Sequence, residues 1–361
     1  MARQSNWVLP SEGGVFTSGS EGPAAANRAV ISGPGASVVA NPATSNSNQT
    51  NSSGHPTNPI IGGVNGSTGN PNLSGNPNVV AIPVTVPGNA PTERISNLSA
   101  RAVSGSAENQ SIAGFVIAGT ESKTLLLRAV GPTLADFGVS RVISAPVLDL
   151  IQNQTLIASN QGWTNATNAA AIAAAAETAG AFPLPETAAD SALLVDLQPG
   201  AYTAMVRDDT VTEGVVLVEV YDVNPSAVHS RLVNLSTRAP VESGEGVLTA
   251  GFVVTGAVPK QVLVRGVGPT LQEFGLSQTL ADPQITVYQG DTEVATNNNW
   301  DHGSDALTTA FNTVSAFVLP AGSTDAALLL SLQPGTYTVQ LSNADATPPD
   351  GVALVEIYEL P

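Results

Sequence analysis

The sequence predicts an all-β protein: two tandem jelly-roll-like antiparallel β-sandwiches, each with one short helix, preceded by an extended N-terminal segment rich in Asn, Gly and Ser. Three observations lead to this fold class. Aromatic residues make up 4% of the chain and charged residues 11%, whereas Gly, Pro, Val, Thr and Asn are plentiful. Short apolar runs are separated by turn residues, as in sandwiches and barrels. The whole pattern occurs twice, which indicates duplicated domains.

A strand, turn and helix motif marks both copies. Residues 128–138 read RAVGPTLADFG and residues 265–275 read RGVGPTLQEFG, a separation of 265 − 128 = 137 residues. The proline of each motif suits the first helical position, where its missing N–H costs no hydrogen bond. The last glycine suits the left-handed residue that ends a helix. We therefore expect each motif to form a strand end, a tight turn and a single helical turn, with an architectural role.

The repeat divides the chain into three parts. An extended low-complexity segment covers residues 1–93, the first copy covers residues 94–227, and the second copy covers residues 228–361. Two copies of this length are too few and too long for a solenoid, so they are predicted to be tandem domains.

Each copy is predicted to hold many short strands and one helix. Asn168 is placed to cap a helix over residues 169–178, and Gly180 is placed to close it. The equivalent helix is expected to start near Ser304 or Asp305. In the first copy we expect strands near residues 94–101, 111–119, 123–130, 147–151, 154–159, 191–197, 201–207 and 214–222.

The N-terminal segment differs from the two copies, because residues typical of turns and disorder dominate it. Strand-forming stretches interrupt it at residues 29–32, 37–40, 60–64 and 79–86. The last stretch alternates, so that one face of an extended strand carries Val80, Ile82, Val84 and Val86. Because Pro83 lacks an N–H, such a strand can pair on one side only. We expect it to donate a strand to an exposed sheet edge of a neighbouring subunit.

The composition excludes several classes of partner. A formal charge of −17 with only 12 Lys and Arg residues argues against nucleic acid and against anionic membrane surfaces. No apolar run reaches the roughly 18 residues of a membrane helix, and the first residues lack the apolar core of a secretory signal. The absence of cysteine excludes disulfides and thiolate sites. We expect an extracellular or cell-surface location, reached by another export route or through a signal outside this sequence.

No group of residues has the pattern of a catalytic or metal site. His55, His229 and His302 fall in different segments and at no repeated position, so neither a triad nor a histidine metal site is expected. The loop at residues 297–301, with Asp305, is rich in the oxygen ligands that Ca²⁺ prefers. Asn and Asp in loops more often form turns, however. We predict no enzymatic activity, no cofactor and no bound metal.

Two charged residues interrupt apolar strands in both copies. Arg128 and Glu219 recur as Arg265 and Glu356. Because unpaired burial costs several kcal/mol, we predict a structural Arg–Glu ion pair in each copy. A catalytic carboxylate is the alternative, but a neighbouring Arg stabilises the charge of the carboxylate, which suits structure better than acid–base chemistry.

Two further segments carry a family resemblance. Residues 156–163 (LIASNQGW) with residues 197–203 (LQPGAYT) resemble the pre-peptidase C-terminal type of β-sandwich module, and residues 292–300 (TEVATNNNW) with residues 332–338 (LQPGTYT) repeat the likeness. Both copies are also similar to repeats of exported and surface proteins of environmental bacteria. The resemblance leaves out the N-terminal segment. It implies an extracellular sandwich without catalysis of its own, of a kind in which some relatives bind Ca²⁺.

Two classes of function remain open. The favoured class is a structural subunit of an extracellular assembly (a filament, sheath or surface layer) that polymerises with copies of itself through the N-terminal segment. The alternative is a cell-surface adhesin or a pair of carbohydrate-binding modules. Trp163 and Trp300 occupy equivalent positions and bear on the choice, because exposed they would form a ligand platform and buried they would anchor loops. Strands that are apolar on both faces also require a cover over the sheets.

Overall fold

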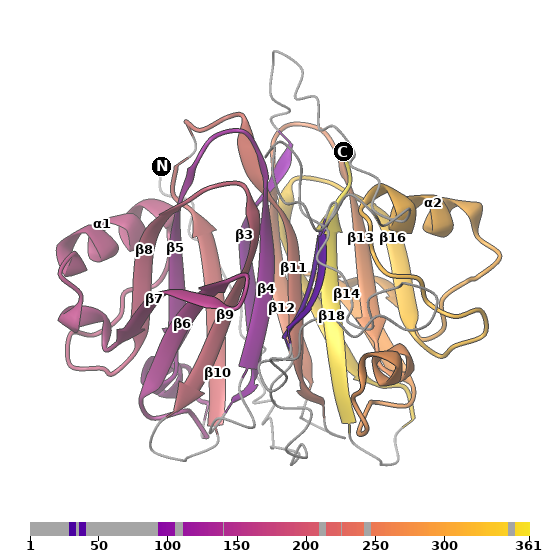
Figure 1. The fold of residues 1–361 in the computed structure, drawn as a ribbon, viewed down its shortest axis with the longest axis horizontal. Helices are drawn as coiled ribbons and strands as arrows, with labels where there is room; N and C mark the ends of the chain where they lie inside the picture. Colours follow the sequence, from indigo (N-terminus) through magenta and orange to yellow (C-terminus); the bar gives the residue numbers. More distant parts are fainter. Residues whose placement is uncertain are drawn as a thin grey trace, which may run out of the picture.

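The computed structural model describes residues 93–104, 111–139, 141–208, 214–224, 226–241, 247–345 and 351–361, together with the backbone of residues 29–33 and 36–40. The sixteen strands of the two copies form one hydrogen-bonded antiparallel network. The copies lie side by side, the first in purple to salmon and the second in orange to yellow (Figure 1). Among the described residues, no helix has the length and apolar character required to cross a membrane.

The described residues of the first copy form eight strands, two 3₁₀ helices and one α-helix. The helices are η1 (Pro132–Phe137), η2 (Trp163–Asn165) and α1 (Ala169–Ala179). The strands are β3 (Arg94–Ser104), β4 (Ser111–Gly119), β5 (Lys123–Val130), β6 (Pro146–Gln152), β7 (Thr155–Gln161), β8 (Ser191–Leu197), β9 (Gly200–Asp208) and β10 (Gly214–Asp222).

The second copy repeats this order of strands. Its described helices are η3 (Pro269–Phe274) and α2 (Asp305–Thr313). Its strands are β11 (Ser230–Val241), β12 (Leu248–Thr255), β13 (Lys260–Val267), β14 (Pro283–Gln289), β15 (Thr292–Asn297), β16 (Ala326–Leu332), β17 (Gly335–Asn343) and β18 (Gly351–Glu359).

Each copy has jelly-roll topology. In the first copy, β3, β10, β5 and β8 are neighbours in one sheet, and β4, β9, β6 and β7 are neighbours in the other. When the strands of a copy are numbered in chain order, the two sheets read 1-8-3-6 and 2-7-4-5, the arrangement of a jelly roll. The second copy has the same pairings. The predicted class of antiparallel β-sandwich is therefore confirmed.

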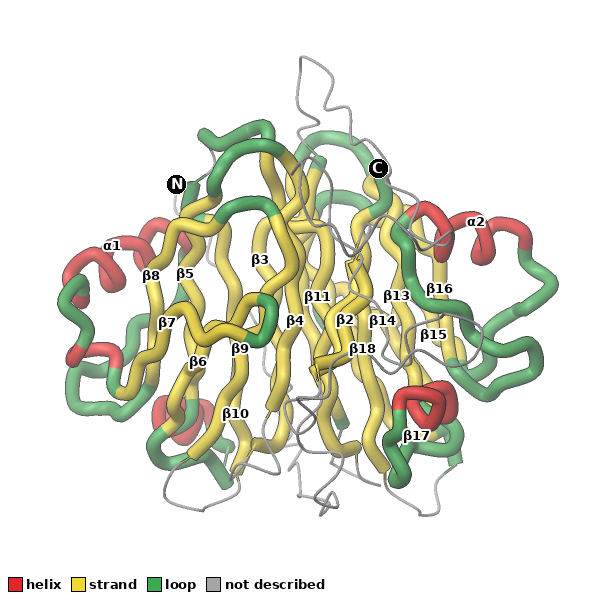
Figure 2. Tube along the Cα trace, in the orientation of Figure 1, coloured by secondary structure: helices red, strands yellow, loops and turns green. Residues whose placement is uncertain are grey.

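The two sandwiches are joined edge to edge, which the sequence did not indicate. β3 of the first copy pairs with β12 of the second, and β11 of the second pairs with β4 of the first. Each sheet of one copy therefore continues into a sheet of the other. One long sheet runs β8–β5–β10–β3–β12–β17–β14–β15, and the other runs β7–β6–β9–β4–β11–β18–β13–β16 (Figure 2). The junction leaves neither first strand as a free edge.

The sheets carry apolar side chains on both faces, and different parts of the chain cover them. The inner faces form one continuous core across both copies. In the first copy, Ile172 of α1 and Trp163 pack over Leu126 and Tyr221 on the outer face. In the second copy, α2 covers the equivalent outer face. The sequence required a cover over the apolar strands, and the two α-helices supply it on these outer faces.

The repeated motif forms the predicted strand end, turn and single helical turn. η1 and η3 begin at Pro132 and Pro269, and the glycines that follow them have φ values of 84° and 86°. The glycine directly before the proline of each motif allows a close approach of the chain. A Cβ on Gly131 would lie 2.3 Å from the carbonyl oxygen of Ile143, and the equivalent glycine of the second copy is equally confined.

The helices also begin and end largely as predicted. α1 covers Ala169–Ala179 and is closed by Gly180 in the left-handed conformation. Asn168 precedes α1, but its side chain makes no capping hydrogen bond, and its amide donates to the carbonyl oxygen of Leu194 instead. In α2, Ser304 caps the helix and accepts a hydrogen bond from the backbone N–H of Leu307.

Part of the N-terminal segment folds back on the same chain. β1 (Ala29–Gly33) and β2 (Ala36–Ala40) form an antiparallel hairpin, as the strand-forming stretches predicted. β1 lies against β4, β9 and β11, where the two copies meet. Two other predicted strand-forming stretches lie outside the described residues: residues 60–64, and the stretch with Val80, Ile82, Val84 and Val86.

Candidate functional site

Both predicted ion pairs are present and buried. Arg128 of β5 and Glu219 of β10 face each other in register, with 2.8 Å between Nε and Oε2. Arg265 of β13 and Glu356 of β18 also face each other in register, with 3.0 Å between Nε and Oε2. All four side chains are at most 1% exposed. Paired strands thus place opposite charges where apolar residues surround them.

The rest of each cluster fixes both charged groups. In the first copy, the Tyr221 hydroxyl donates to the second carboxylate oxygen of Glu219 at 2.6 Å. Arg128 Nη1 donates to the carbonyl oxygen of Phe182 at 2.7 Å, and the guanidinium lies 4.3 Å from the centre of the Phe182 ring. Because Glu219 is ion-paired through one oxygen and accepts a hydrogen bond through the other, the cluster suits structure rather than proton transfer.

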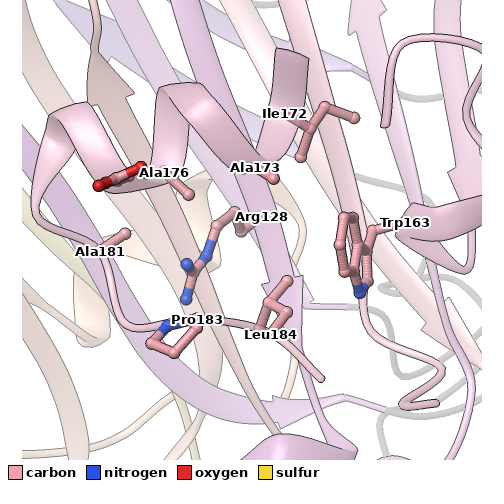
Figure 3. Close-up of a pocket in the computed structure, with 9 residues that line it drawn as sticks. Arg128, Trp163, Ile172, Ala173, Ala176, Ala181, Pro183 and Leu184 are labelled. Carbon is pink, nitrogen blue, oxygen red and sulfur yellow. The ribbon is translucent and has the colours of Figure 1, made fainter. Parts of the chain in front are cut away.

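A cavity opens beside this cluster in the first copy. It has a volume of 390 Å³ and lies between α1, the loop after α1 and the sheet (Figure 3). Its walls are apolar apart from the buried Arg128 and the exposed Glu177 at the mouth. Nη2 of Arg128 has no hydrogen-bond partner among the described residues. The cavity therefore combines an apolar lining with one buried cation, as a pocket for a small molecule does.

The repeated tryptophans are loop anchors and do not form a platform. Trp163 and Trp300 are 7% and 8% exposed. Their ring N–H groups donate to the carbonyl oxygens of Pro185, at 3.2 Å, and Pro320, at 3.1 Å. Trp163 also forms one wall of the cavity (Figure 3). Of the two sequence interpretations for this pair, the loop anchor is correct, because each ring satisfies its N–H inside the domain.

A second repeated carboxylate escaped the sequence analysis. Asp190 is fully buried, and it accepts hydrogen bonds from the backbone N–H of Gly131 at 2.8 Å and from the Thr133 side chain. Asp325 makes the same bonds in the second copy, to Gly268 and Thr270. These aspartates satisfy the N–H groups at the start of η1 and η3, where a carboxylate is favourable. The signal available in the sequence was the recurrence of Asp eight residues after Phe182 and after Phe317, since 190 − 182 = 8 and 325 − 317 = 8.

The segments that carried the family resemblance have a structural explanation. In LQPGAYT, the Tyr202 hydroxyl donates back to the carbonyl oxygen of Gln198 at 2.8 Å. Tyr337 makes the same bond to Gln333. Burial raises the pKa of both tyrosines above the ordinary value of 10.0. This is the geometry of a tyrosine corner, in which a buried ring ties a turn to the strand that follows it.

The remaining candidate residues do not converge. The described part of the chain holds no group of three or more His, Asp or Glu side chains placed to bind a metal. His302 lies edge-on to Trp300, the backbone N–H of His229 donates to Glu121, and His55 lies outside the described residues. In the loop at residues 297–301, Asp301 accepts a hydrogen bond from the backbone N–H of Gly303 in a local turn, and Asn297 accepts one from the backbone N–H of Ala327 in β16.

No family model and no curated protein matches the chain. Among solved structures, it shows similarity to PNGF-II, with 12% identity, a TM-score of 0.20, and coverage of 75% of this chain and 58% of that one. The tandem CBM51 modules of a family 98 glycoside hydrolase from Streptococcus pneumoniae match at 9% identity and a TM-score of 0.19, over 72% of this chain and 83% of those modules. STIV MCP matches at 12% identity and a TM-score of 0.18, over 75% of this chain and 90% of that one. Because all three TM-scores lie below 0.5, the fold is established by the strand pairing of this chain alone.

Proposed function

We propose that this chain is a non-catalytic binding protein of the cell exterior, and that the cavity beside Arg128 is its ligand site. One observation carries the proposal: the first copy keeps an open cavity of 390 Å³ over a fully buried arginine. Open volume in a protein core costs packing energy. A cavity with a polar group inside and an opening to solvent is the ordinary form of a ligand site.

The ligand class follows from the lining. Ile172, Leu184 and Trp163 offer apolar contacts, and the one buried cation is already neutralised by Glu219. A sugar would leave its hydroxyl groups without partners on such walls. The site therefore fits a small apolar ligand better than the carbohydrate that the sequence suggested as the ligand of a binding module.

The test compares the protein with the variant Ala176→Phe, which places a ring in the cavity. Both proteins are screened by thermal unfolding against a panel of oligosaccharides and small cyclic compounds. The proposal expects at least one compound to raise the unfolding temperature of the parent protein and not that of the variant. A panel in which no compound distinguishes the two proteins would count against the proposal. An oligosaccharide that binds both equally would place a glycan site elsewhere.

A second candidate function is the structural subunit that polymerises through strand donation. The observation in its favour is the exposed strand at the end of each long sheet. In β7, Leu156 and Ile157 are 56% and 43% exposed, and in β15, Val294 is 42% exposed. Apolar edge strands are templates for an added strand, and the donor would be the stretch with Val80, Ile82, Val84 and Val86.

This second candidate is tested by deleting residues 1–90 and looking for polymers by electron microscopy and light scattering. Strand donation requires polymers from the full chain and none from the truncated one. A matched variant, Ile157→Lys, places a charge in the edge strand and should have the same effect. A full-length protein that stays monodisperse and monomeric would rule the assembly out.

A further inference from the structure

The two copies provide an internal comparison for the cavity. The carbonyl oxygens of Phe182 and Phe317 accept hydrogen bonds from Arg128 and Arg265, so these two phenylalanines are equivalent. Equivalent residues after α1 and α2 are therefore 317 − 182 = 135 positions apart. The backbone N–H of Ala181 donates to the carbonyl oxygen of Ala176, and that of Ala316 donates to Phe311, both at 2.9 Å. Ala176 and Phe311 therefore occupy the same place in the two copies.

Phe311 shows what fills this place in the second copy. Its ring is 4% exposed, and its centre lies 5.0 Å from the guanidinium carbon of Arg265 and 5.6 Å from the centre of the Trp300 ring. Phe317 lies on the same guanidinium at 4.2 Å. The arginine of the second copy is thus in contact with two phenyl rings, an arrangement that favours a delocalised cation.

The first copy keeps the same surroundings without the second phenylalanine ring. Phe182 lies 4.3 Å from the guanidinium carbon of Arg128, as Phe317 does from that of Arg265. Ala176 replaces Phe311, and α1 carries alanine at eight of its 11 positions. The cavity is lined by Arg128, Trp163 and Ala176, the equivalents of the residues that surround and carry the Phe311 ring (Figure 3).

The charges around the cavity favour a neutral ligand. Glu219 neutralises Arg128 at 2.8 Å, and Glu177 adds a carboxylate at the mouth. An anionic ligand would meet this second carboxylate and would have to leave water for an apolar pocket. The face of an aromatic ring carries a negative quadrupole, so it is attracted by the guanidinium without a net charge of its own.

We propose that the cavity binds a neutral aromatic ring, stacked on Arg128 in the place that the Phe311 ring occupies on Arg265. This inference rests on the proposed binding function and specifies its ligand class. The site is present in the first copy and closed in the second, because a side chain of the protein already occupies the second one.

The experiment uses three soluble probes of similar size on the full chain: p-cresol, 4-methylcyclohexanol and benzoate. Binding is followed by NMR of ¹³C-labelled alanine methyl groups, since Ala173, Ala176 and Ala181 line the cavity. We expect p-cresol to shift these methyl signals, and the saturated ring to bind about tenfold more weakly because it lacks the attraction to the cation. Benzoate should bind more weakly than p-cresol.

Two variants serve as matched controls. Ala176→Phe should abolish the p-cresol shifts, because it fills the first copy as Phe311 fills the second. Phe311→Ala should open the equivalent cavity over Arg265 and raise the stoichiometry of p-cresol from one to two. Phe311→Ala leaves a cavity in the core and destabilises the fold. The loss of binding in Ala176→Phe is therefore the decisive result.

Equal affinity for the aromatic and the saturated ring would overturn the aromatic inference and leave the binding function intact. Shifts that persist in Ala176→Phe would place the probe elsewhere and overturn it as well. If no probe binds the cavity but a compound of the wider panel does, the inference fails alone. If neither the probes nor the panel binds, the proposed function fails with it.

Discussion

At the scale of single residues, the two Arg–Glu pairs show how one charge can stabilise another inside an apolar sheet. Arg128 and Glu219 lie on neighbouring strands and are at most 1% exposed. Neither residue is stable there alone, because a buried charge without a partner keeps its full cost of leaving water. The pair therefore favours the strand register that places Arg128 opposite Glu219, and it adds little net stability of its own.

Replacement of Glu219 by Gln should therefore be strongly destabilising. The substitution keeps the shape of the side chain but leaves Arg128 without a counter-charge, at a cost of about 3–5 kcal/mol. Chemical denaturation with urea measures the difference in free energy of unfolding. The exposed Glu186→Gln is the control and should change stability by less than about 0.5 kcal/mol. A comparably small loss for Glu219→Gln would mean that the arginine finds water in the cavity.

Asp282 offers a prediction with a defined dependence on pH. Burial raises its pKa above the ordinary value of 3.8, and the nearby charge of Asp345 raises it further. One oxygen of Asp282 is buried without a hydrogen-bond partner in the described structure. The first copy has Ala145 at this position, since 282 − 137 = 145. The ionised carboxylate is therefore unfavourable to folding, and stability is lost as the pH rises from 3.8 through the raised pKa.

Asp282→Ala should accordingly be more stable than the parent protein at pH 7. The gain should shrink as the pH falls towards 3.8, where the parent carboxyl is protonated in both states and the penalty is absent. Thermal unfolding of both proteins between pH 3 and pH 7 measures this difference. A gain that stays constant over the whole range would assign it to packing rather than to charge.

At the scale of elements, the two α-helices differ in how they end and in what they bury. α1 ends at Gly180 with φ 70°, whereas α2 ends near Ser315 with φ 54°. Non-glycine residues rarely take this left-handed conformation, because the Cβ approaches the backbone. α2 keeps the strained serine and anchors itself through Leu307 and Phe311. α1 ends without strain but buries Ile172 as its one fully buried side chain.

Ser315→Gly should stabilise the second copy by up to about 1 kcal/mol, because glycine takes the left-handed conformation without cost. The measurement is the urea midpoint of unfolding, with the slope unchanged. Gly180→Ser is the reciprocal control and should lose a similar amount. If both changes destabilise, the Ser315 side chain has a role beyond the backbone conformation.

At the scale of the whole molecule, the junction between the copies replaces two free sheet edges in each. β3 and β4 are the edge strands on one side of the first jelly roll, and they pair with β12 and β11 of the second copy. Glu359 strengthens the junction, because it accepts a hydrogen bond from the backbone N–H of Ile95 in the other copy at 2.8 Å while it pairs with Arg231 at 2.7 Å. The arrangement has the reciprocal character of a twofold interface made within one chain.

An isolated second copy, residues 228–361, should therefore form a symmetric dimer. Removal of the first copy exposes β11 and β12 along their whole length, and the β11 of one molecule can pair with the β12 of another. Size-exclusion chromatography with light scattering measures the mass, and residues 94–227 serve as the parallel case. A stable monomer of either fragment would show that the junction is dispensable for folding.

The repeat, the strands and the ion pairs were predictable from the sequence because each depends on local pattern. Alternating apolar runs specify strands, and proline and glycine at set positions specify the helical turns of η1 and η3. Arg128 and Glu219 could be paired in advance because both interrupt apolar strands and both recur in the second copy. A buried charge requires a partner wherever the strands lie, so that inference needed no coordinates.

The junction and the cavity were decided only by the tertiary structure. Backbone hydrogen bonds between β3 and β12 carry no side-chain signature, so nothing in the sequence marks which edge strand finds which partner. The cavity depends on the absence of a side chain: alanine at position 176 suits any helix, and its effect is visible only once the place of Phe311 in the other copy is known. Local pattern determines which elements form, whereas empty volume and strand partnership depend on how distant parts of the chain come together.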